Sequence, residues 1–78
     1  MKETMYELFT DVWRLADKYQ FRPLNDAEWE AFVVEGKRLL TRYQQKGILI
    51  ELLYRDLFSA VQEYYKNIGE DSNYGKKG

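Results

Sequence analysis

Residues 5–19, MYELFTDVWRLADKY, carry the pattern that decides the fold. Apolar side chains recur there three and four residues apart, which places them on one face of an α-helix: Met5, Leu8, Phe9, Val12, Leu15, Ala16 and Tyr19. The opposite face carries charged and polar residues. Two more aromatic residues, Tyr6 and Trp13, lie along one edge of the apolar face. We therefore expect an amphipathic helix at residues 3–20 that packs against other helices.

The break after this helix is marked by Pro23, which cannot continue a helix. Asn25 is a favourable N-cap, and Glu28 three residues later completes the capping-box pattern. We therefore expect a second helix at residues 26–46, closed by Gly47 in the left-handed conformation. Its apolar face is expected to consist of Trp29, Phe32, Val33, Gly36, Leu39, Leu40 and Tyr43. A glycine on that face lets another helix approach closely.

A third helix is expected at residues 49–67, and its inward face is read as Ile50, Leu53, Tyr54, Leu57, Val61, Tyr64 and Ile68. Phe58 and Tyr65 widen one side of this face. Residues 69–78 are polar and are expected to form a disordered tail after a single helical domain at residues 1–68. Short connections favour antiparallel neighbours, so the fold class is all-α, with a three-helix antiparallel (up-down-up) bundle.

Residue types needed for most catalytic and metal sites are missing from the chain, which has no cysteine and no histidine. Disulfides and the zinc sites built on these ligands are therefore excluded. Serine and threonine lack the histidine that most often activates them as nucleophiles. Glu3, Glu7 and Asp11 lie one turn apart, a row that is usually a solvated face rather than a cation site. We expect no enzyme activity, no cofactor, no metal site and no small-molecule substrate.

The overall charge argues against a dedicated nucleic-acid-binding domain. Twelve basic and 13 acidic residues give a formal net charge of −1, whereas such domains are usually clearly basic because they neutralise phosphates. Arg38, Arg42 and Lys46 nevertheless line up one turn apart on the outward side of the second helix. They leave open an alternative function, a nucleic-acid-associated regulator that binds an anion or a nucleic acid through this stripe.

Neither a signal peptide nor a membrane span is expected. Residues 1–7 are interrupted by charge and lack the apolar core of a signal peptide. The longest apolar stretch, residues 48–54, is split by Glu51 and is too short to cross a bilayer. We therefore expect a cytoplasmic protein with no membrane partner.

A set of apolar residues falls outside the inward faces or at their edges: Tyr6, Trp13, Ile48, Leu49, Leu52, Phe58 and Tyr65. Their aromatic content is typical of protein interfaces. A chain of this size buries only about 60% of its unfolded surface, so a monomer would be marginally stable. We therefore expect a non-enzymatic protein-interaction module (an adaptor, inhibitor or regulatory subunit) that forms a homodimer through these residues or binds another protein. A wide, well-filled monomeric core is the remaining alternative.

Overall fold

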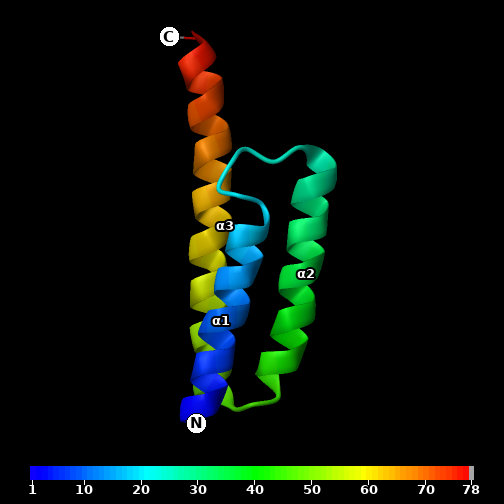
Figure 1. The fold of residues 1–78 in the computed structure, drawn as a ribbon, viewed down its shortest axis with the longest axis vertical. Helices are drawn as coiled ribbons and strands as arrows, with labels where there is room; N and C mark the ends of the chain where they lie inside the picture. Colours follow the sequence, from blue (N-terminus) through cyan, green and yellow to red (C-terminus); the bar gives the residue numbers. More distant parts are fainter. Residues whose placement is uncertain (78) are drawn as a thin grey trace.

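The computed structural model describes the backbone of residues 1–77 and the side chains of residues 1–69. It contains three helices, α1 (Lys2–Lys18), α2 (Asp26–Gln44) and α3 (Ile48–Lys77) (Figure 1). Residues 1–77 contain no strand, and the predicted all-helical three-helix bundle is confirmed. In Figure 1 the connection between α1 and α2 lies at the upper end, and the connection between α2 and α3 lies at the lower end, near the N-terminus.

The backbone of α3 is helical well past its expected end at residue 67. The predicted polar tail, residues 69–78, falls mostly on residues whose side chains lie outside the described part of the chain, so its disorder stays a prediction. Within the described residues, none of the helices carries an apolar stretch long enough to cross a lipid bilayer.

α1 ends at Lys18, ahead of the expected residue 20, because Gln20 and Phe21 leave the helical region. Their φ angles are 59° and 52°, in the left-handed region that costs a non-glycine residue roughly 1–2 kcal/mol. The Gln20 amide still donates to the Asp17 carbonyl at 3.0 Å, which tightens the end of the helix. This turn carries Phe21 back towards α3, where its ring lies beside two tyrosines.

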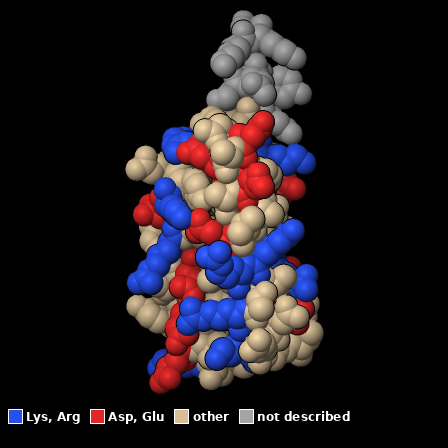
Figure 2. Space-filling model, turned by 90° about the vertical axis from the view of Figure 1, so that its right-hand side faces the viewer, with Lys and Arg blue, Asp and Glu red and all other residues tan. Residues whose placement is uncertain are grey.

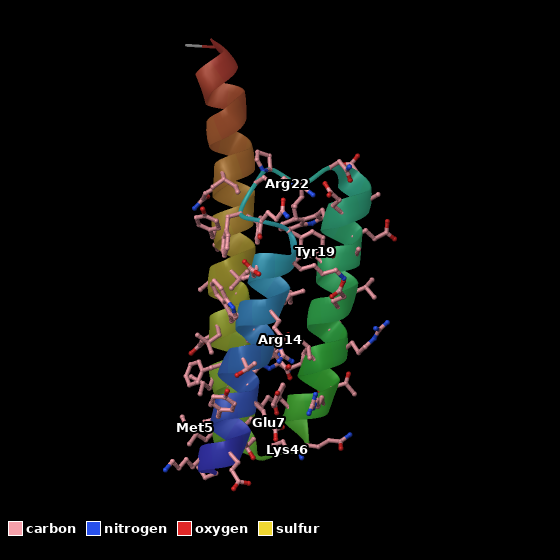
Figure 3. All side chains as sticks on the ribbon, in the orientation of Figure 1. Met5, Glu7, Arg14, Tyr19, Arg22 and Lys46 are labelled. Carbon is pink, nitrogen blue, oxygen red and sulfur yellow. The ribbon has the colours of Figure 1, made fainter. Side chains whose placement is uncertain are left out.

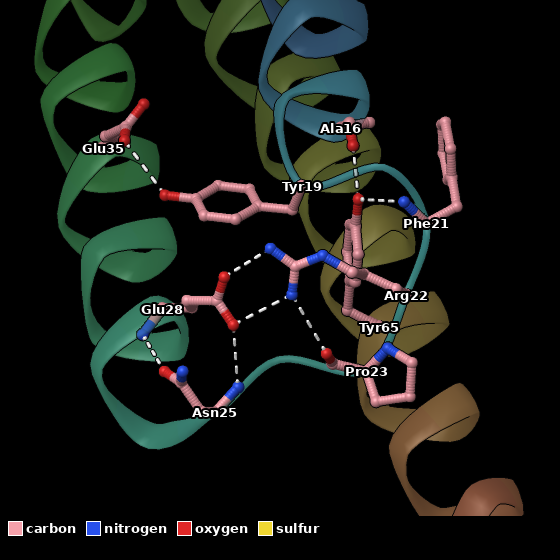
Figure 4. A network of polar contacts seen from close by, with 9 residues as sticks. All are labelled: Ala16, Tyr19, Phe21, Arg22, Pro23, Asn25, Glu28, Glu35 and Tyr65. Carbon is pink, nitrogen blue, oxygen red and sulfur yellow. Dashed lines mark hydrogen bonds and ion pairs between the residues drawn. The ribbon is translucent and has the colours of Figure 1, made fainter.

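The start of α2 has the predicted capping box. The Glu28 amide donates to the Asn25 side-chain oxygen at 2.8 Å, and the Asn25 amide donates to the Glu28 carboxylate at 3.1 Å. The Arg22 guanidinium donates to both oxygens of the same carboxylate (Figure 4). These bonds, led by the one from Arg22, lower the pKa of Glu28 to about 2. The carboxylate therefore ties the α1–α2 connection to α2 in its charged form.

Replacement of this carboxylate should change the acid sensitivity of the protein. Its pKa falls from an ordinary value of 4.5 to about 2 on folding, so its contribution is present above pH 4.5 and is lost as the pH falls towards about 2. We expect Glu28→Gln to lower Tm at neutral pH and to flatten the fall in Tm over that range. Glu30→Gln, an exposed change on the same helix, should keep the wild-type profile. Parallel profiles for Glu28→Gln and wild type would contradict the expectation.

Gly47 has the positive φ angle that was predicted, but α2 already ends at Gln44, ahead of its expected end at residue 46, with Gln45 as its C-cap. The Gly47 φ of 112° lies in the region that favours glycine, because a side chain there would be strained. The Gly47 carbonyl accepts a hydrogen bond from the Glu51 amide at 3.0 Å. α3 therefore starts directly after Gly47, at Ile48.

The core consists of two apolar clusters, and each helix contributes to both. One contains Leu8, Val12, Tyr43, Ile50 and Tyr54, and the other contains Leu15, Tyr19, Phe32 and Tyr65. The buried tyrosine hydroxyls all have hydrogen-bond partners; for example, Tyr54 donates to the Gly36 carbonyl at 2.7 Å. Among the described side chains, no buried polar atom lacks a partner. The tyrosines therefore fill the core without the cost of an unsatisfied hydroxyl.

The buried face of α3 differs from the predicted one. Tyr64 was expected to point inward and Tyr65 to lie at the edge, but Tyr64 is 45% exposed and Tyr65 only 2% exposed. α3 packs against both α1 and α2, so its buried stripe is centred between these two helices. Gly36 adds to this shift, because its missing side chain leaves room for the Phe58 ring: a Cβ there would lie 2.1 Å from Phe58 Cζ.

Candidate protein-interaction surface

Three predicted interface residues form an exposed aliphatic patch where α3 begins. Ile48, Leu49 and Leu52 are 70%, 56% and 52% exposed. Positions three and four residues apart are neighbours on a helix surface, so the three side chains are contiguous. Tyr6 is exposed on α1 at the same end of the bundle, since the neighbouring Met5 packs on the cluster of Ile50 and lies near the lower end in Figure 3. We call Tyr6, Ile48, Leu49 and Leu52 the end patch.

A second exposed apolar surface is a groove between α1 and α3, with a volume of about 420 Å³. Small side chains of Ala16 and Ala60 keep it open, and Phe21 and Tyr64 stand beside them. The Phe21 ring centroid lies 5.8 Å from that of Tyr64 and 6.0 Å from that of Trp13, which is 59% exposed. The three rings therefore form a row along this surface. We call it the aromatic groove and define it by Trp13, Ala16, Phe21, Ala60, Val61 and Tyr64.

Tyr65 is buried beneath the aromatic groove and contacts Phe21 through both its hydroxyl and its ring. Its hydroxyl donates to the Ala16 carbonyl and accepts a hydrogen bond from the Phe21 amide at 3.1 Å (Figure 4). Its ring stacks on that of Phe21, with centroids 6.1 Å apart. Burial raises the pKa of Tyr65 above its usual value, and the bond from Phe21 lowers it in part. Tyr65 thus does not lie on the interaction surface as predicted; it holds Phe21 in place.

Phe58, also predicted to lie on an interface, is another core residue. It is only partly exposed and packs against both apolar clusters. Its ring lies 5.3 Å from Phe32 and 5.9 Å from Tyr54, centroid to centroid. It therefore belongs to the α2–α3 contact over Gly36 and does not extend the exposed surface.

Of the three rings in the aromatic groove, only Trp13 was among the predicted candidates, and Phe21 and Tyr64 were not. Phe21 lies in the irregular connection after α1, where helical periodicity carries no information about the direction of a side chain. Tyr64 was assigned to the core. Neighbouring residues on a helix point about 100° apart, so Tyr64 and Tyr65 cannot both lie at the centre of one buried face. That conflict was the available signal that one tyrosine faces solvent.

The predicted basic stripe is partly neutralised by α1. The Arg42 guanidinium lies 3.3 Å from a Glu7 carboxylate oxygen and 3.4 Å from one of Asp11. Figure 2 shows Lys and Arg side chains beside a column of Asp and Glu side chains on this face. Arg38 lines a shallow groove between α1 and α2 together with Asp11 and Glu35. Lys46 lies beyond the end of α2, near the lower end of the bundle (Figure 3).

Two residues of the acidic row on α1, Glu7 and Asp11, contact α2. Besides its contact with Arg42, Asp11 accepts a hydrogen bond of 2.5 Å from the Tyr43 hydroxyl. Burial, followed by this bond, raises the pKa of Tyr43 well above its usual value. In the part of the chain that the structure describes, no three residues of the metal-ligating types converge. Glu7 and Asp11 therefore join helices.

No family model, curated protein or solved structure matches this chain. The function proposed below therefore rests on the two exposed apolar surfaces and on the charges beside them.

Proposed function

We propose that this chain is a non-enzymatic protein-interaction module that forms a homodimer through the end patch. The observation that carries the proposal is the exposure of three contiguous aliphatic side chains, Ile48, Leu49 and Leu52, on a helix whose opposite face is buried. Contiguous exposed apolar patches are typical of interaction sites, whereas scattered apolar residues are not. A core this small is marginally stable, and a second copy over the patch would add buried apolar area.

We further propose that the three helices form an antiparallel up-down-up bundle. The module would act in the cytoplasm as an adaptor, an inhibitor or a regulatory subunit of another protein. The helix order is supported by the two short connections at opposite ends of the bundle in Figure 1. In a two-fold dimer the same patch on both copies forms the interface, so every patch residue is used twice. A substitution there consequently counts twice in the dimerisation free energy.

Measurement of the mass in solution by light scattering tests the proposal. Wild type should approach twice its chain mass of 9.4 kDa as its concentration rises. Leu49→Ser combined with Leu52→Ser should weaken dimerisation at least about tenfold, because two half-buried aliphatic side chains are lost from each copy. Val34→Ser, a change of an exposed valine on α2, is the matched control and should leave the dimer intact. A wild-type monomer at every concentration would refute the dimer.

A nucleic-acid-associated regulator that uses Arg38, Arg42 and Lys46 is the alternative function. It has less support, because Glu7 and Asp11 already neutralise Arg42. An electrophoretic shift at low salt that weakens steeply with added salt, and that Arg38→Ala plus Arg42→Ala abolishes, would favour the alternative over our proposal. We expect no shift.

A further inference from the structure

The centres of the aromatic groove and of the end patch lie apart along the helices, although the exposed Phe9 lies one turn from both Tyr6 and Trp13 on α1. Its α3 residues, Ala60, Val61 and Tyr64, lie two to three helical turns beyond Leu52, which corresponds to roughly 12–18 Å along the helix. Its α1 residues, Trp13 and Ala16, belong to the second half of that helix. Another polypeptide can therefore occupy the groove while the end patch is covered.

Three acidic residues lie beside the aromatic groove. Asp17 lies one turn from Trp13 on α1, while Asp56 and Glu63 lie one turn from Ala60 on α3. No ion pair within residues 1–69 involves any of these three carboxylates. The groove thus has an apolar floor and an edge with three carboxylates that form no ion pair within these residues.

Two of the basic side chains near this edge are paired with other carboxylates. Lys18 is paired with Glu35 on α2 at 2.5 Å, and Arg55 is paired with Glu51 on its own helix at 3.0 Å. Neither cation is therefore available to neutralise the acidic edge.

Phe21, the middle ring of the aromatic groove, is held in place by contacts within the chain. Phe21 has a left-handed backbone conformation, with a φ of 52°, which persists only where surrounding contacts enforce it. The Tyr65 hydroxyl supplies such a contact through the Phe21 amide. A ring that is already ordered costs little further conformational entropy on binding. The other two rings of the groove belong to Trp and Tyr, which are enriched among the residues that dominate binding energy.

We infer that the aromatic groove binds an amphipathic helix of a partner protein whose apolar face is flanked by Lys or Arg. An apolar side chain of this helix sits over Ala16 and Ala60, and its basic flanks face Asp17, Asp56 and Glu63. This is the helix-in-groove mode of recognition, and the opposite charges at the edge provide its specificity. The groove of a second copy is a poor occupant, because its acidic edge would meet the same charges. The inference rests on the proposed role in protein interaction but does not require the dimer.

Two synthetic helical peptides test the inference. Both carry Leu along one face; one has Lys at the flanking positions, and the other has Glu at the same positions. Binding to the full chain is followed by the fluorescence anisotropy of the labelled peptide. The Lys peptide should bind in a salt-sensitive way, and the Glu peptide should bind at least about tenfold more weakly, because like charges repel at the edge.

Matched variants locate the binding site. Trp13→Ala should weaken binding of the Lys peptide at least about tenfold, whereas Val34→Ala, which shortens an exposed apolar side chain on α2, should leave it within about twofold. Asp56→Asn plus Glu63→Gln should weaken binding about three- to tenfold. Glu3→Gln plus Glu30→Gln changes the net charge equally and should have no such effect. Tm of each variant, measured alongside, shows that the folded chain is being compared.

Several outcomes would overturn the inference. They are failure of the Lys peptide to bind, equal binding of both peptides, or equal weakening by Trp13→Ala and Val34→Ala. Dissociation of the dimer by Trp13→Ala would instead assign the groove to a second copy. The proposed dimer is tested separately by the mass in solution. If the chain is a dimer but does not bind the Lys peptide, only this inference is refuted. If the chain is a monomer that binds the Lys peptide, only the proposed dimer is refuted.

Discussion

Gly36→Ala is expected to lower the free energy of unfolding of the bundle, because the added methyl group overpacks the contact between α2 and α3. Overpacking typically costs about 1–3 kcal/mol, and we expect a loss in the upper half of that range. The added Cβ would lie 2.1 Å from Phe58 Cζ and 2.3 Å from Cε1, so the ring has to move. It is held between Phe32 and Tyr54, and any movement disturbs both. Alanine gains only about 1 kcal/mol over glycine within a helix. Each kcal/mol lost should lower Tm by roughly 4–8 °C in a domain of this size.

A double-mutant cycle isolates this contact. Phe58→Leu removes the far end of the ring, so Gly36→Ala should cost little or be stabilising in that background. Chemical unfolding of the four proteins gives the coupling free energy between the two positions. An unchanged or raised stability of Gly36→Ala in the wild-type background would mean that α2 and α3 do not meet through this ring.

Tyr65→Phe is expected to lower the free energy of unfolding by about 1–3 kcal/mol, because it leaves a buried backbone group without its partner. The lost hydroxyl serves the Ala16 carbonyl at the end of α1 and the Phe21 amide in the turn. Unfolding by denaturant measures the loss. Amide hydrogen exchange at Phe21 should also become faster, since the hydrogen bond that protects it is gone.

The adjacent tyrosine provides the control for this change. Tyr64→Phe removes a hydroxyl from the same helix, but Tyr64 is 45% exposed and its hydroxyl makes no hydrogen bond within the described residues. Its free energy of unfolding should stay within about 0.5 kcal/mol of wild type. Equal losses for the two variants would show that the Tyr65 hydroxyl does not hold the end of α1.

The signals that predicted the helices from sequence were local ones. The capping box at Asn25 and the left-handed Gly47 each depend on a few neighbouring residues, and both appear in the structure as expected. Gly36 was also interpreted correctly as a point of close approach. These features are set by backbone sterics and short-range hydrogen bonds, which the order of residues fixes directly.

The rotation of α3 about its own axis was not predictable in the same way. Its sequence offers a broad apolar surface, and several rotations would bury a comparable amount of it. The rotation in the structure is selected by partners far along the chain: Gly36 admits the Phe58 ring, and the Ala16 carbonyl and the Phe21 amide bind the Tyr65 hydroxyl. For this reason Tyr64 and Tyr65 exchanged their predicted places.

The candidate surface was predicted only in part for the same reason. Ile48, Leu49 and Leu52 are exposed as expected, since they surround a helix start that can bury only one side. The position of Phe21 depends on the turn after α1, where two non-glycine residues adopt positive φ angles. No sequence pattern favours that conformation, so the aromatic groove emerges only from the tertiary structure.

Disulfide cross-linking measures most directly whether two copies meet at the end patch. The chain has no cysteine of its own, so a single introduced thiol reports only contacts of its own position. Leu49→Cys and Leu52→Cys are oxidised in parallel with Val34→Cys, whose site is exposed on α2. A disulfide needs Cα atoms within about 7 Å. We predict rapid formation of covalent dimers at position 49 or 52 and slow formation at position 34; equal rates at all three positions would contradict the proposed interface.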